Sequence, residues 1–424
     1  MGILIISFLI GLFLGIPISF SLGIATVIFI IATNVLPFNL VIETMYTSAE
    51  SFPLMAIPFF VLAGELMNRT GITQRLIDFA TFFLGRFRGG LSHVSVLSGA
   101  TFAGLSGSSV AETAALGKTL GGAMIKQGYN REFAAALIAS IGVMAPVIPP
   151  SIIIILYGSQ MNVSIGQMFV GGIIPGLLIA LLLMIYSYIV SVRKGYPKSE
   201  VPFSWKGLFD VSLAASLAIM MPLIIVFGIR GGIFTPTEGG AIAAAYSLIV
   251  GGVVYRTLSF KDIGESFISS GILSAVIMLV VAMSSPFGWV MSYFSLPQQF
   301  AEAMLGITES PTLILLMMII LLIFVGMFLE GAAIVMLLGP VLAPMAPLIG
   351  VNPIHFGIIV VIAIALGMIT PPVGVNLFVI SPIMQTSIEK ISIAILPFIL
   401  ILIIAILIVA FVPELVLWLP SIIG

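Results

Sequence analysis

The chain has 424 residues, of which 60% are hydrophobic and only 7% are charged, and its formal net charge is −1. Soluble domains are about 25% charged, so the composition excludes a soluble globular protein. It predicts an all-α polytopic membrane protein with the lipid bilayer as its solvent and no nucleic-acid partner. The chain contains no cysteine, which excludes disulfides and thiolate metal sites.

The first ninety residues predict two spans and an interfacial helix. Gly2–Ile31 is long enough for one span, with Pro17 inside it, and Asn34–Ser51 is a polar connection. Phe52–Met67 returns across the bilayer. Asn68–Gly90 then mixes arginines with leucine and phenylalanine, which is typical of a helix lying along the membrane surface.

The following hundred residues contain two unusual elements. Leu91–Lys118 is apolar but interrupted at residues 104–112. Because a span needs about 20 residues, this run predicts a re-entrant hairpin rather than two crossings. Glu132–Gly158 is expected to be a broken helix, and Met168–Val192 an ordinary span.

The second half of the chain repeats this order. We expect two spans around an exposed loop (Val211–Ile229 and Gly239–Val254), a third span (Ile263–Met283), an arm (Pro286–Glu309), a hairpin (Thr312–Leu348), a broken helix (His355–Ile380) and a last span (Ile391–Trp418). The same order of unusual elements in both halves indicates an internal repeat.

These elements divide the chain into seven parts. They are N-terminal scaffold spans (1–67), a cytoplasmic interfacial arm (68–90), a first transport repeat (91–192), a cytoplasmic linker (193–210), further scaffold spans (211–285), a periplasmic interfacial arm (286–309) and a second transport repeat (310–424). In this arrangement the two arms would brace a fixed scaffold around a moving transport domain.

The positions of the basic residues predict the orientation. With the N-terminus in the cytoplasm and the C-terminus in the periplasm, 14 of the 15 lysines and arginines fall inside, and Arg230 is the exception. This agrees with the excess of basic residues in cytoplasmic loops of membrane proteins. The two hairpins then enter from opposite faces, which predicts an inverted-topology repeat.

Two proline pairs support the repeat and locate its centre. A shift of 222 residues superimposes the pair at 149–150 on the pair at 371–372, and further matches are Gly104 with Gly326, Gly128 with Gly350, Asn130 with Asn352, Ser159 with Ser381 and Pro175 with Pro397. On a helical backbone the prolines would free the carbonyls of Ala145, Pro146, Gly367 and Met368. Broken helices at corresponding places in two halves mark the binding site of a transporter.

The first hairpin tip carries hydroxyls at the expected depth of the membrane centre. Ser106, Ser108 and Ser109 stand beside Gly107, and helix ends carry partial charges that attract ions. Hydroxyls and carbonyls of this kind suit sodium, a hard cation that prefers oxygen ligands. The alternative is that small residues at the tip only permit close helix packing.

Four carboxylates lie within or beside apolar runs: Glu65, Glu112, Glu238 and Glu330. Glu112 and Glu330 follow the two hairpin tips, where they would either couple ions or protons or cap backbone amides. Glu65 and Glu238 lie near span ends, where structural hydrogen bonds are the better explanation. The chain has no hydrolase or nucleotide-binding motif, so an enzyme is not expected.

Four motifs together resemble one family. They are Ala56–Gly71 (AIPFFVLAGELMNRTG), Gly107–Ala111 (GSSVA), Pro149–Ile152 (PPSI) with Tyr157–Gly158, and Phe234–Ala241 (FTPTEGGA). In this order and spacing they resemble the large membrane subunit of the TRAP transporters, the tripartite ATP-independent periplasmic class, and the resemblance covers essentially the whole chain.

The resemblance implies a mechanism and partners. Such subunits resemble the ion-transporter superfamily, in which a domain of hairpins and broken helices moves like an elevator against a scaffold. Sodium would be the only metal, with two or more ions per cycle, and no organic cofactor is implied. The permease would lie in the bacterial inner membrane, and a periplasmic binding protein would deliver the substrate to it. A small four-helix membrane subunit would be a separate chain, because this chain starts at the large subunit's first span.

The resemblance also implies site residues. Sodium site 1 would involve Ser106, Ser108, Ser109, Ala145, Pro146, Val147 and Pro150, and sodium site 2 would involve Gly326, Gly331, Gly367, Thr370, Pro371 and Gly374. A carboxylate substrate would lie near Ser108, Ser109 and Asn376. For Thr370, a structural role at the break is an open alternative.

The resemblance implies sodium-coupled uptake of an organic acid, with sialic acid as the expected substrate. C4-dicarboxylate members share every motif, so a C4-dicarboxylate permease is the first alternative. A standalone carboxylate carrier coupled to sodium or protons, without a binding protein, is the second. A channel is disfavoured because paired hairpins and breaks indicate a sequestered, alternating site.

Overall fold

The structure is a computed structural model that describes residues 1–198 and 204–423. Helices account for the regular structure of these ranges, which contain no β-strand. The prediction of an all-α protein is therefore confirmed. Part of the predicted linker, residues 199–203, lies outside the described residues.

Both halves of the chain contain many helices, which range from single short turns to long spans. The first half contains α1 (Gly2–Phe13), α2 (Ile18–Thr33), α3 (Asn39–Ala49), η1 (Phe52–Met55), α4 (Ala56–Arg69), α5 (Ile72–Leu84), α6 (Gly90–Ser106), α7 (Ser109–Leu116), η2 (Gly117–Gly121), α8 (Gly122–Lys126), α9 (Arg131–Ile141), η3 (Gly142–Met144), α10 (Ile152–Met161) and α11 (Ile165–Lys194). The second half contains α12 (Trp205–Arg230), α13 (Pro236–Ile249), η4 (Val250–Val254), α14 (Phe260–Tyr293), α15 (Leu296–Ile307), α16 (Pro311–Gly326), α17 (Gly331–Leu342), α18 (Met345–Leu348), α19 (Pro353–Gly367), α20 (Val375–Met384), α21 (Ile388–Phe411) and α22 (Glu414–Ile423).

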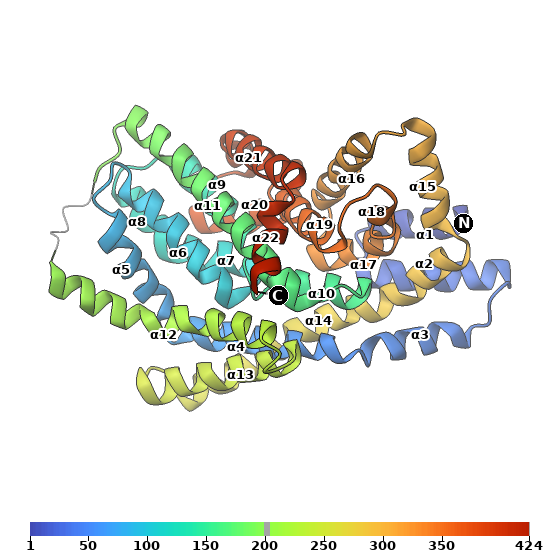
Figure 1. Cartoon of the computed structure of the whole chain (residues 1–424), viewed down its shortest axis with the longest axis horizontal. Coiled ribbons are helices and arrows are strands. Elements are labelled where there is room, and N and C mark those ends of the chain that lie inside the picture. Colours follow the sequence, from blue (N-terminus) through green and yellow to red (C-terminus); the bar gives the residue numbers. More distant parts are fainter. Residues whose placement is uncertain (199–203, 424) are drawn as a thin grey trace.

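The long apolar helices identify a multi-pass membrane protein. Among the described residues, α11, α12, α13 with η4, α14 and α21 are each long and apolar enough to cross a bilayer. The pair formed by α3 and η1–α4 makes a sixth candidate, bent by 57°. Figure 1 shows α12, α4, α13 and α14 along one side of the molecule, with the hairpin and broken helices gathered beside them.

The N-terminal segment differs from the single span predicted at Gly2–Ile31. It forms two helices, α1 and α2, separated by a turn before Pro17. A Cβ added at Gly11 would lie 2.9 Å from the Ser21 hydroxyl, although residues ten apart in one straight helix are about 15 Å apart. The chain therefore folds back on itself here. The reason is that Gly15, with a φ of 76°, ends α1 in a left-handed turn, in which the Ile16 amide donates to the Gly11 carbonyl at 3.0 Å; Pro17 then precedes α2.

Several other element boundaries also differ from the prediction. The span predicted at Ile391–Trp418 is divided into α21 and α22, and α12 begins at Trp205, within the predicted linker. The helix expected to end at Met283 continues as α14 to Tyr293, with Pro286 inside it, so the second arm is reduced to α15. The polar connection 34–51 contains α3. Proline is tolerated within a membrane helix because neighbouring groups satisfy the freed carbonyl, which is why Pro286 does not end α14.

Both predicted hairpins and both predicted breaks correspond to interruptions of helix. Hairpin 1 consists of α6 and α7, and hairpin 2 of α16 and α17. The first break, residues 142–151, separates α9 from α10, and the second break, residues 368–374, separates α19 from α20. Side chains of α19 from His355 onward are all buried, so a broken helix forms the centre of the core.

Local structure repeats at the positions that a 222-residue shift superimposes. Asn130 caps α9 by accepting a hydrogen bond from the Phe133 amide at 2.9 Å, and Asn352 caps α19 by accepting one from the Ile354 amide at 2.9 Å. Gly128 and Gly350 before them both have positive φ, at 84° and 73°. These paired caps support the repeat, while the inverted relation of the two halves stays a prediction.

Candidate functional site

The tip of hairpin 1 packs against the first break. Gly107 ends α6 with a φ of 58°, and a Cβ at this position would lie 2.8 Å from the Pro150 carbonyl oxygen. Only glycine fits both the left-handed backbone and the close approach. Ser108 then begins α7, where its hydroxyl accepts a hydrogen bond from the Ala111 amide at 3.4 Å. The predicted tip is thus brought directly onto the predicted break.

The carbonyl of Pro146, which we expected to be free, has a donor. The Ser151 hydroxyl donates to it at 2.5 Å and accepts a hydrogen bond from the Ile154 amide at 3.2 Å. Ser151 therefore caps α10 and satisfies the broken backbone at the same time. The proline pair predicts the position of the break. The capping role of Ser151 was not predicted, although a serine directly before a helix is a capping signal.

Both carbonyls expected to be free at the second break also have donors. The Gly367 carbonyl accepts a hydrogen bond from the Thr370 backbone amide at 2.9 Å, and the Met368 carbonyl accepts one from the Asn376 backbone amide at 3.0 Å. The hydroxyl of Thr370 donates to the Leu366 carbonyl at 2.7 Å. Thr370 thus forms a hydrogen bond of the kind expected if its role at the break is structural. Its hydroxyl oxygen still has lone pairs with which it could bind a sodium ion.

Hairpin 2 meets the second break through glycines. A Cβ added at Gly367 would lie 2.5 Å from the Gly326 Cα, so α16 and α19 touch backbone to backbone. The Gly374 amide donates to the Met327 carbonyl at 2.9 Å. Gly331 approaches the Ile153 side chain of α10. Gly326 and Gly367 thus allow close packing of α16 against α19, and the two hairpins meet through α10.

One hydrogen bond joins the predicted substrate residues of the two repeats. The Nδ2 group of the Asn376 side chain donates to the Ser109 hydroxyl at 2.7 Å, and the two residues are 267 positions apart in the sequence. Both side chains are buried, and the Asn376 Oδ1 atom has no hydrogen-bond partner. A Cβ at Gly142 would meet both the Thr113 hydroxyl and the Asn376 amide nitrogen, so this glycine leaves room for the pair.

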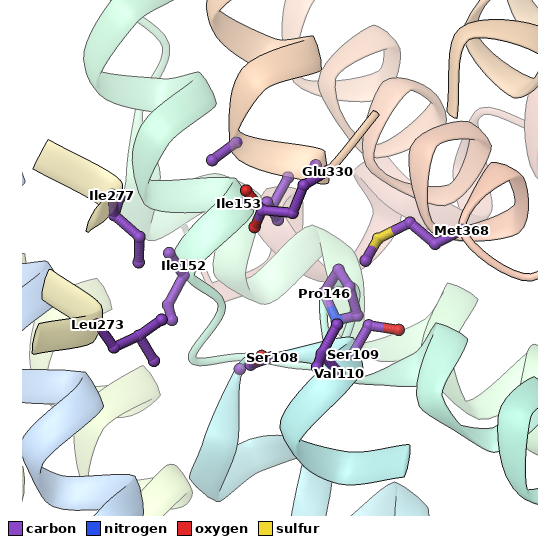
Figure 2. Close-up of a pocket in the computed structure, with 13 residues that line it drawn as sticks. Ser108, Ser109, Val110, Pro146, Ile152, Ile153, Leu273, Ile277, Glu330 and Met368 are labelled. Atoms are coloured by element: carbon purple, nitrogen blue, oxygen red, sulfur yellow. The ribbon is translucent and has the colours of Figure 1, made fainter. Parts of the chain in front are cut away.

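A cavity of about 40 Å³, the central cavity, lies between the two hairpin tips, the two breaks and α14. Its lining residues are Gly107, Ser108, Ser109, Val110, Pro146, Ile152, Ile153, Leu273, Ile277, Glu330, Gly331, Ala332 and Met368. Figure 2 shows Glu330 entering from hairpin 2 above Ser108, Ser109 and Pro146. Among the described residues, Glu330 is the one charged residue in this lining, and no lysine or arginine lines it.

The four predicted carboxylates lie in different environments. Glu112 is fully buried, and neither of its carboxylate oxygens has a hydrogen-bond partner; Ser108 caps α7 in its place. Glu330 lines the central cavity. Glu238 forms a capping box with Thr235, and Glu65 accepts from Arg69 at 3.1 Å. Structural hydrogen bonding is confirmed for Glu65 and Glu238.

The site contains no set of side chains for a transition metal. Among the described residues no group of three histidines, aspartates or glutamates could hold a metal ion. The ring Nε2 of His355 lies 2.8 Å from the Val409 carbonyl oxygen, as expected for a histidine that ties two helices together. Hydroxyls, backbone carbonyls, the Asn376 Oδ1 atom and the Glu330 carboxylate are the oxygens that the site offers to a cation.

Helix pairs that meet interrupted helices around one cavity define the chain as a membrane transporter component. The family model described as "Tripartite ATP-independent periplasmic transporter, DctM component" matches residues 5–415. The chain therefore belongs to the DctM family of TRAP transporter large permeases. Its relatives are permeases rather than enzymes, which confirms both the resemblance and the expectation that the chain is not an enzyme.

Three relatives show how closely the chain matches the family. It is 37% identical to the sialic acid TRAP transporter large permease SiaM of Vibrio cholerae, over 97% of this chain and 96% of that protein. It is 36% identical to the C4-dicarboxylate large permease DctM of the same species, over 96% and 94%. It is 40% identical to the isethionate permease DctMQ of Oleidesulfovibrio alaskensis over 96% of this chain, but spans only 64% of that protein.

Solved structures share the fold at low sequence identity. The YdaH transporter of Alcanivorax borkumensis has a TM-score of 0.61 and 14% identity, covering 88% of this chain and 87% of that chain. MtrF of Neisseria gonorrhoeae has a TM-score of 0.60 and 14% identity, covering 87% and 82%. These similarities concern the fold alone.

Proposed function

We propose that the chain is the permease subunit through which an organic acid and sodium ions enter the cell together, by elevator-type alternating access. The observation that supports this function most directly is the central cavity, where two hairpin tips and two breaks from both repeats meet. Alternating access needs a site that opens to one side at a time, and a cavity enclosed by hairpins on two sides is suited to that role.

We propose an organic anion as the substrate, with sialic acid as the first candidate and a C4-dicarboxylate as the second. The relatives described above are permeases for sialic acid, C4-dicarboxylate and isethionate, all of them anions at neutral pH. No basic side chain lines the central cavity. A substrate carboxylate would instead accept hydrogen bonds from Ser108, Ser109 and Asn376 and from the N-terminus of α7.

Sodium is proposed as the coupling ion at two sites. Site 1 would use the hydroxyls of Ser106–Ser109 with backbone oxygens of residues 145–150, which pack directly on the tip. Site 2 would use Thr370 with backbone oxygens around Gly326, Gly331 and Gly374. The carbonyls that already accept hydrogen bonds have a second lone pair available for an ion. Glu330, which faces the central cavity, is the carboxylate that we propose to influence coupling.

We propose a tripartite assembly in the bacterial inner membrane. As in the family at large, a small membrane subunit and a periplasmic binding protein would complete the transporter. Arg75 of α5, Arg86 and Arg88 just after it, and the basic residues near 193–206 favour a cytoplasmic position for these segments. We keep the N-terminus in the cytoplasm and the C-terminus in the periplasm as the proposed orientation.

The proposal is tested by uptake of radiolabelled sialic acid into proteoliposomes containing the chain and its small subunit. Binding protein and an inward sodium gradient are each present or absent. Uptake that requires both is the expected result. Uptake without the binding protein would instead identify a standalone carrier.

The substrate is tested in the same vesicles with succinate and malate. Transport of these acids, but not of sialic acid, would keep the mechanism and replace the substrate. Uptake that is indifferent to the sodium gradient would overturn the proposed coupling.

A further inference from the structure

A second cavity of about 140 Å³, the lateral cavity, lies on the other side of the hairpin 1 tip. It is lined by Val61, Gly64, Glu65, Asn68, Phe102, Ser106, Ser108, Ala111, Ile152, Ser269, Ser270 and Leu273. These residues come from α4 and α14 on one side and from hairpin 1 and α10 on the other. Three of them, Ser108, Ile152 and Leu273, also line the central cavity.

The two cavities are consecutive along α14. Ser269 and Ser270 face the lateral cavity, Leu273 faces both, and Ile277 faces the central one, so successive turns of one helix line a single route. Figure 2 shows Leu273 and Ile152 approaching each other beside Ser108. These apolar side chains separate the two cavities, while the Ser108 hydroxyl borders both.

The lateral cavity offers oxygen atoms and a negative charge. Within the part of the chain that the structure describes, Glu65 is its only charged lining residue. An amide and four hydroxyls are added by Asn68, Ser106, Ser108, Ser269 and Ser270. Ser106 is the last residue of α6, and a helix C-terminus carries partial negative charge. Gly64 lets α4 approach closely, because a Cβ there would lie 2.8 Å from the Leu105 carbonyl oxygen.

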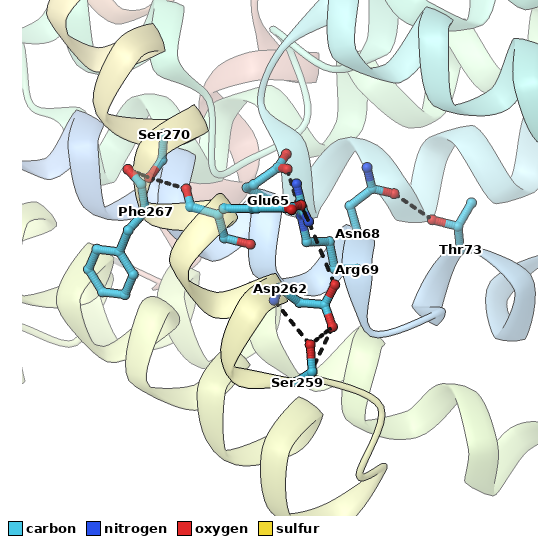
Figure 3. A network of polar contacts seen from close by, with 10 residues as sticks. Glu65, Asn68, Arg69, Thr73, Ser259, Asp262, Phe267 and Ser270 are labelled. Atoms are coloured by element: carbon cyan, nitrogen blue, oxygen red, sulfur yellow. Dashed lines mark hydrogen bonds and ion pairs between the residues drawn. The ribbon is translucent and has the colours of Figure 1, made fainter.

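The surroundings hold Glu65 in place without cancelling the negative charge. Arg69 Nε lies 3.1 Å from Glu65 Oε1, but its NH1 nitrogen pairs with Glu265 at 2.6 Å and Asp262 at 3.7 Å. Figure 3 shows Arg69 between Glu65 on α4 and the α14 carboxylate Asp262. One arginine thus faces three carboxylates, and only Lys261 adds a further positive charge, 3.9 Å from Glu265.

We propose that the lateral cavity is the access site through which sodium reaches and leaves the hairpin 1 tip, with the Glu65 carboxylate as its charged ligand. The proposal rests on the sodium coupling proposed above. Serine hydroxyls and Asn68 replace part of the ion's hydration shell, and Ser108 passes the ion to sodium site 1. An organic anion is repelled by Glu65 and excluded by Leu273 and Ile152, so the ion and the substrate approach the same tip by different routes.

The test compares two variants that remove one Arg69 partner each. Glu65→Gln removes a partner that lines the cavity, whereas Glu265→Gln removes one that does not. Because loss of ligand charge weakens cation binding, the sodium concentration for half-maximal uptake should rise about tenfold in Glu65→Gln. It should change less than about twofold in Glu265→Gln, and the melting temperatures of both purified proteins serve as the folding control.

Equal sodium dependence in the two variants would overturn the proposal and leave Glu65 with a purely structural role. That result is distinct from failure of the proposed function, which would show as sodium-independent uptake by the unmodified chain.

A second measurement needs no change at Glu65. Since the chain lacks cysteine, Ser269→Cys introduces a single thiol at the cavity. A cationic methanethiosulfonate should modify this thiol faster than an anionic one, relative to their rates with free cysteine, and sodium should slow the modification. The same thiol in a Glu65→Gln background should lose the preference. A preference for the anionic reagent, or no protection by sodium, would overturn the proposal.

Discussion

The hydrogen bond from Asn376 to the Ser109 hydroxyl connects two buried side chains from opposite repeats. Removing one partner of such a bond leaves the other unsatisfied, which costs about 1–3 kcal/mol. Asn376→Ala should therefore lower the melting temperature of the purified protein. It should also weaken substrate uptake, if Asn376 contacts the organic acid as proposed.

The matched control is Asn352→Ala. Asn352 caps α19, the other half of the same broken helix, through the Ile354 and His355 amides. Loss of a cap typically costs about 1 kcal/mol without touching the central cavity. If Asn352→Ala reduces substrate affinity as much as Asn376→Ala does at similar stability, Asn376 acts through folding alone.

Glu112 and Glu330 follow the two hairpin tips but differ in what they contact. Glu330 lines the central cavity, whereas Glu112 is sealed in the core without a hydrogen-bond partner. Burying an unpaired charge is costly, so Glu112→Gln should keep or raise the melting temperature and leave uptake within about twofold. Glu330→Gln should reduce sodium-driven uptake more strongly. The reverse order in proteoliposome assays would make Glu112 the coupling residue.

Residues with a chemical signature at a tip or break were predictable from the sequence. Ser108, Ser109 and Asn376 were predicted near one site, and the structure brings Ser109 and Asn376 into contact. Ser151 and Arg69 were missed because their roles depend on partners. A hydroxyl that satisfies a broken backbone, and an arginine that pairs with carboxylates 193 and 196 positions away, both require the folded chain.

At the scale of helices, the contact between α16 and α19 depends on two glycines. A Cβ at Gly367 would lie 2.5 Å from the Gly326 Cα, 2.7 Å from its carbonyl carbon and 2.8 Å from the Ile323 carbonyl oxygen. Because backbone atoms cannot yield as a flexible side chain can, Gly367→Ala should force the helices apart and cost about 1–3 kcal/mol. Thermal unfolding in detergent, followed by fluorescence size-exclusion, measures this loss.

Gly306→Ala on α15 is the control for this prediction. A Cβ there meets no atom within 4 Å, and alanine is the better helix former, so stability should be unchanged or slightly raised. Equal melting temperatures for the two variants would show that α16 and α19 can separate without cost.

The breaks within the two interrupted helices were easier to predict than the residues at which other helices begin and end. The proline pairs locate both breaks, because a missing amide acts on the backbone within four residues. Single prolines were less informative: Pro286 lies inside an uninterrupted α14, whereas Pro17 follows the left-handed turn at Gly15 that ends α1. The turn at Gly15 was missed because the prediction used hydrophobic length, which does not show where a glycine adopts a positive φ.

At the scale of the whole molecule, elevator-type transport requires hairpin 1 to move relative to α12. A Cβ at Gly104 would lie 3.1 Å from the Pro222 Cβ, so a small outward shift brings the two positions to the roughly 3.5–4.5 Å that a disulfide spans. Gly104→Cys with Pro222→Cys, in a chain that has no other cysteine, should therefore form a crosslink on oxidation. Crosslinking should abolish sodium-driven uptake, and a reductant should restore it.

A crosslink between α1 and α2 is the control. A Cβ at Gly11 would lie 3.2 Å from the Ser21 Cβ, and both positions belong to the predicted scaffold. The Gly11→Cys, Ser21→Cys pair should crosslink without loss of uptake. Continued transport by the oxidised Gly104→Cys, Pro222→Cys protein would contradict movement of hairpin 1 past α12.

Several contacts in the core join a segment that is synthesised early to one that is synthesised much later. Ser109 meets Asn376, and Arg131 donates to the Met384 carbonyl 253 residues further on. At typical rates of chain elongation, the ribosome needs on the order of 10 to 50 s to reach these partners. During that interval the interior face of the first half of the chain lacks its partners from the second half, so we expect lipid or another membrane protein to cover it until those helices are made.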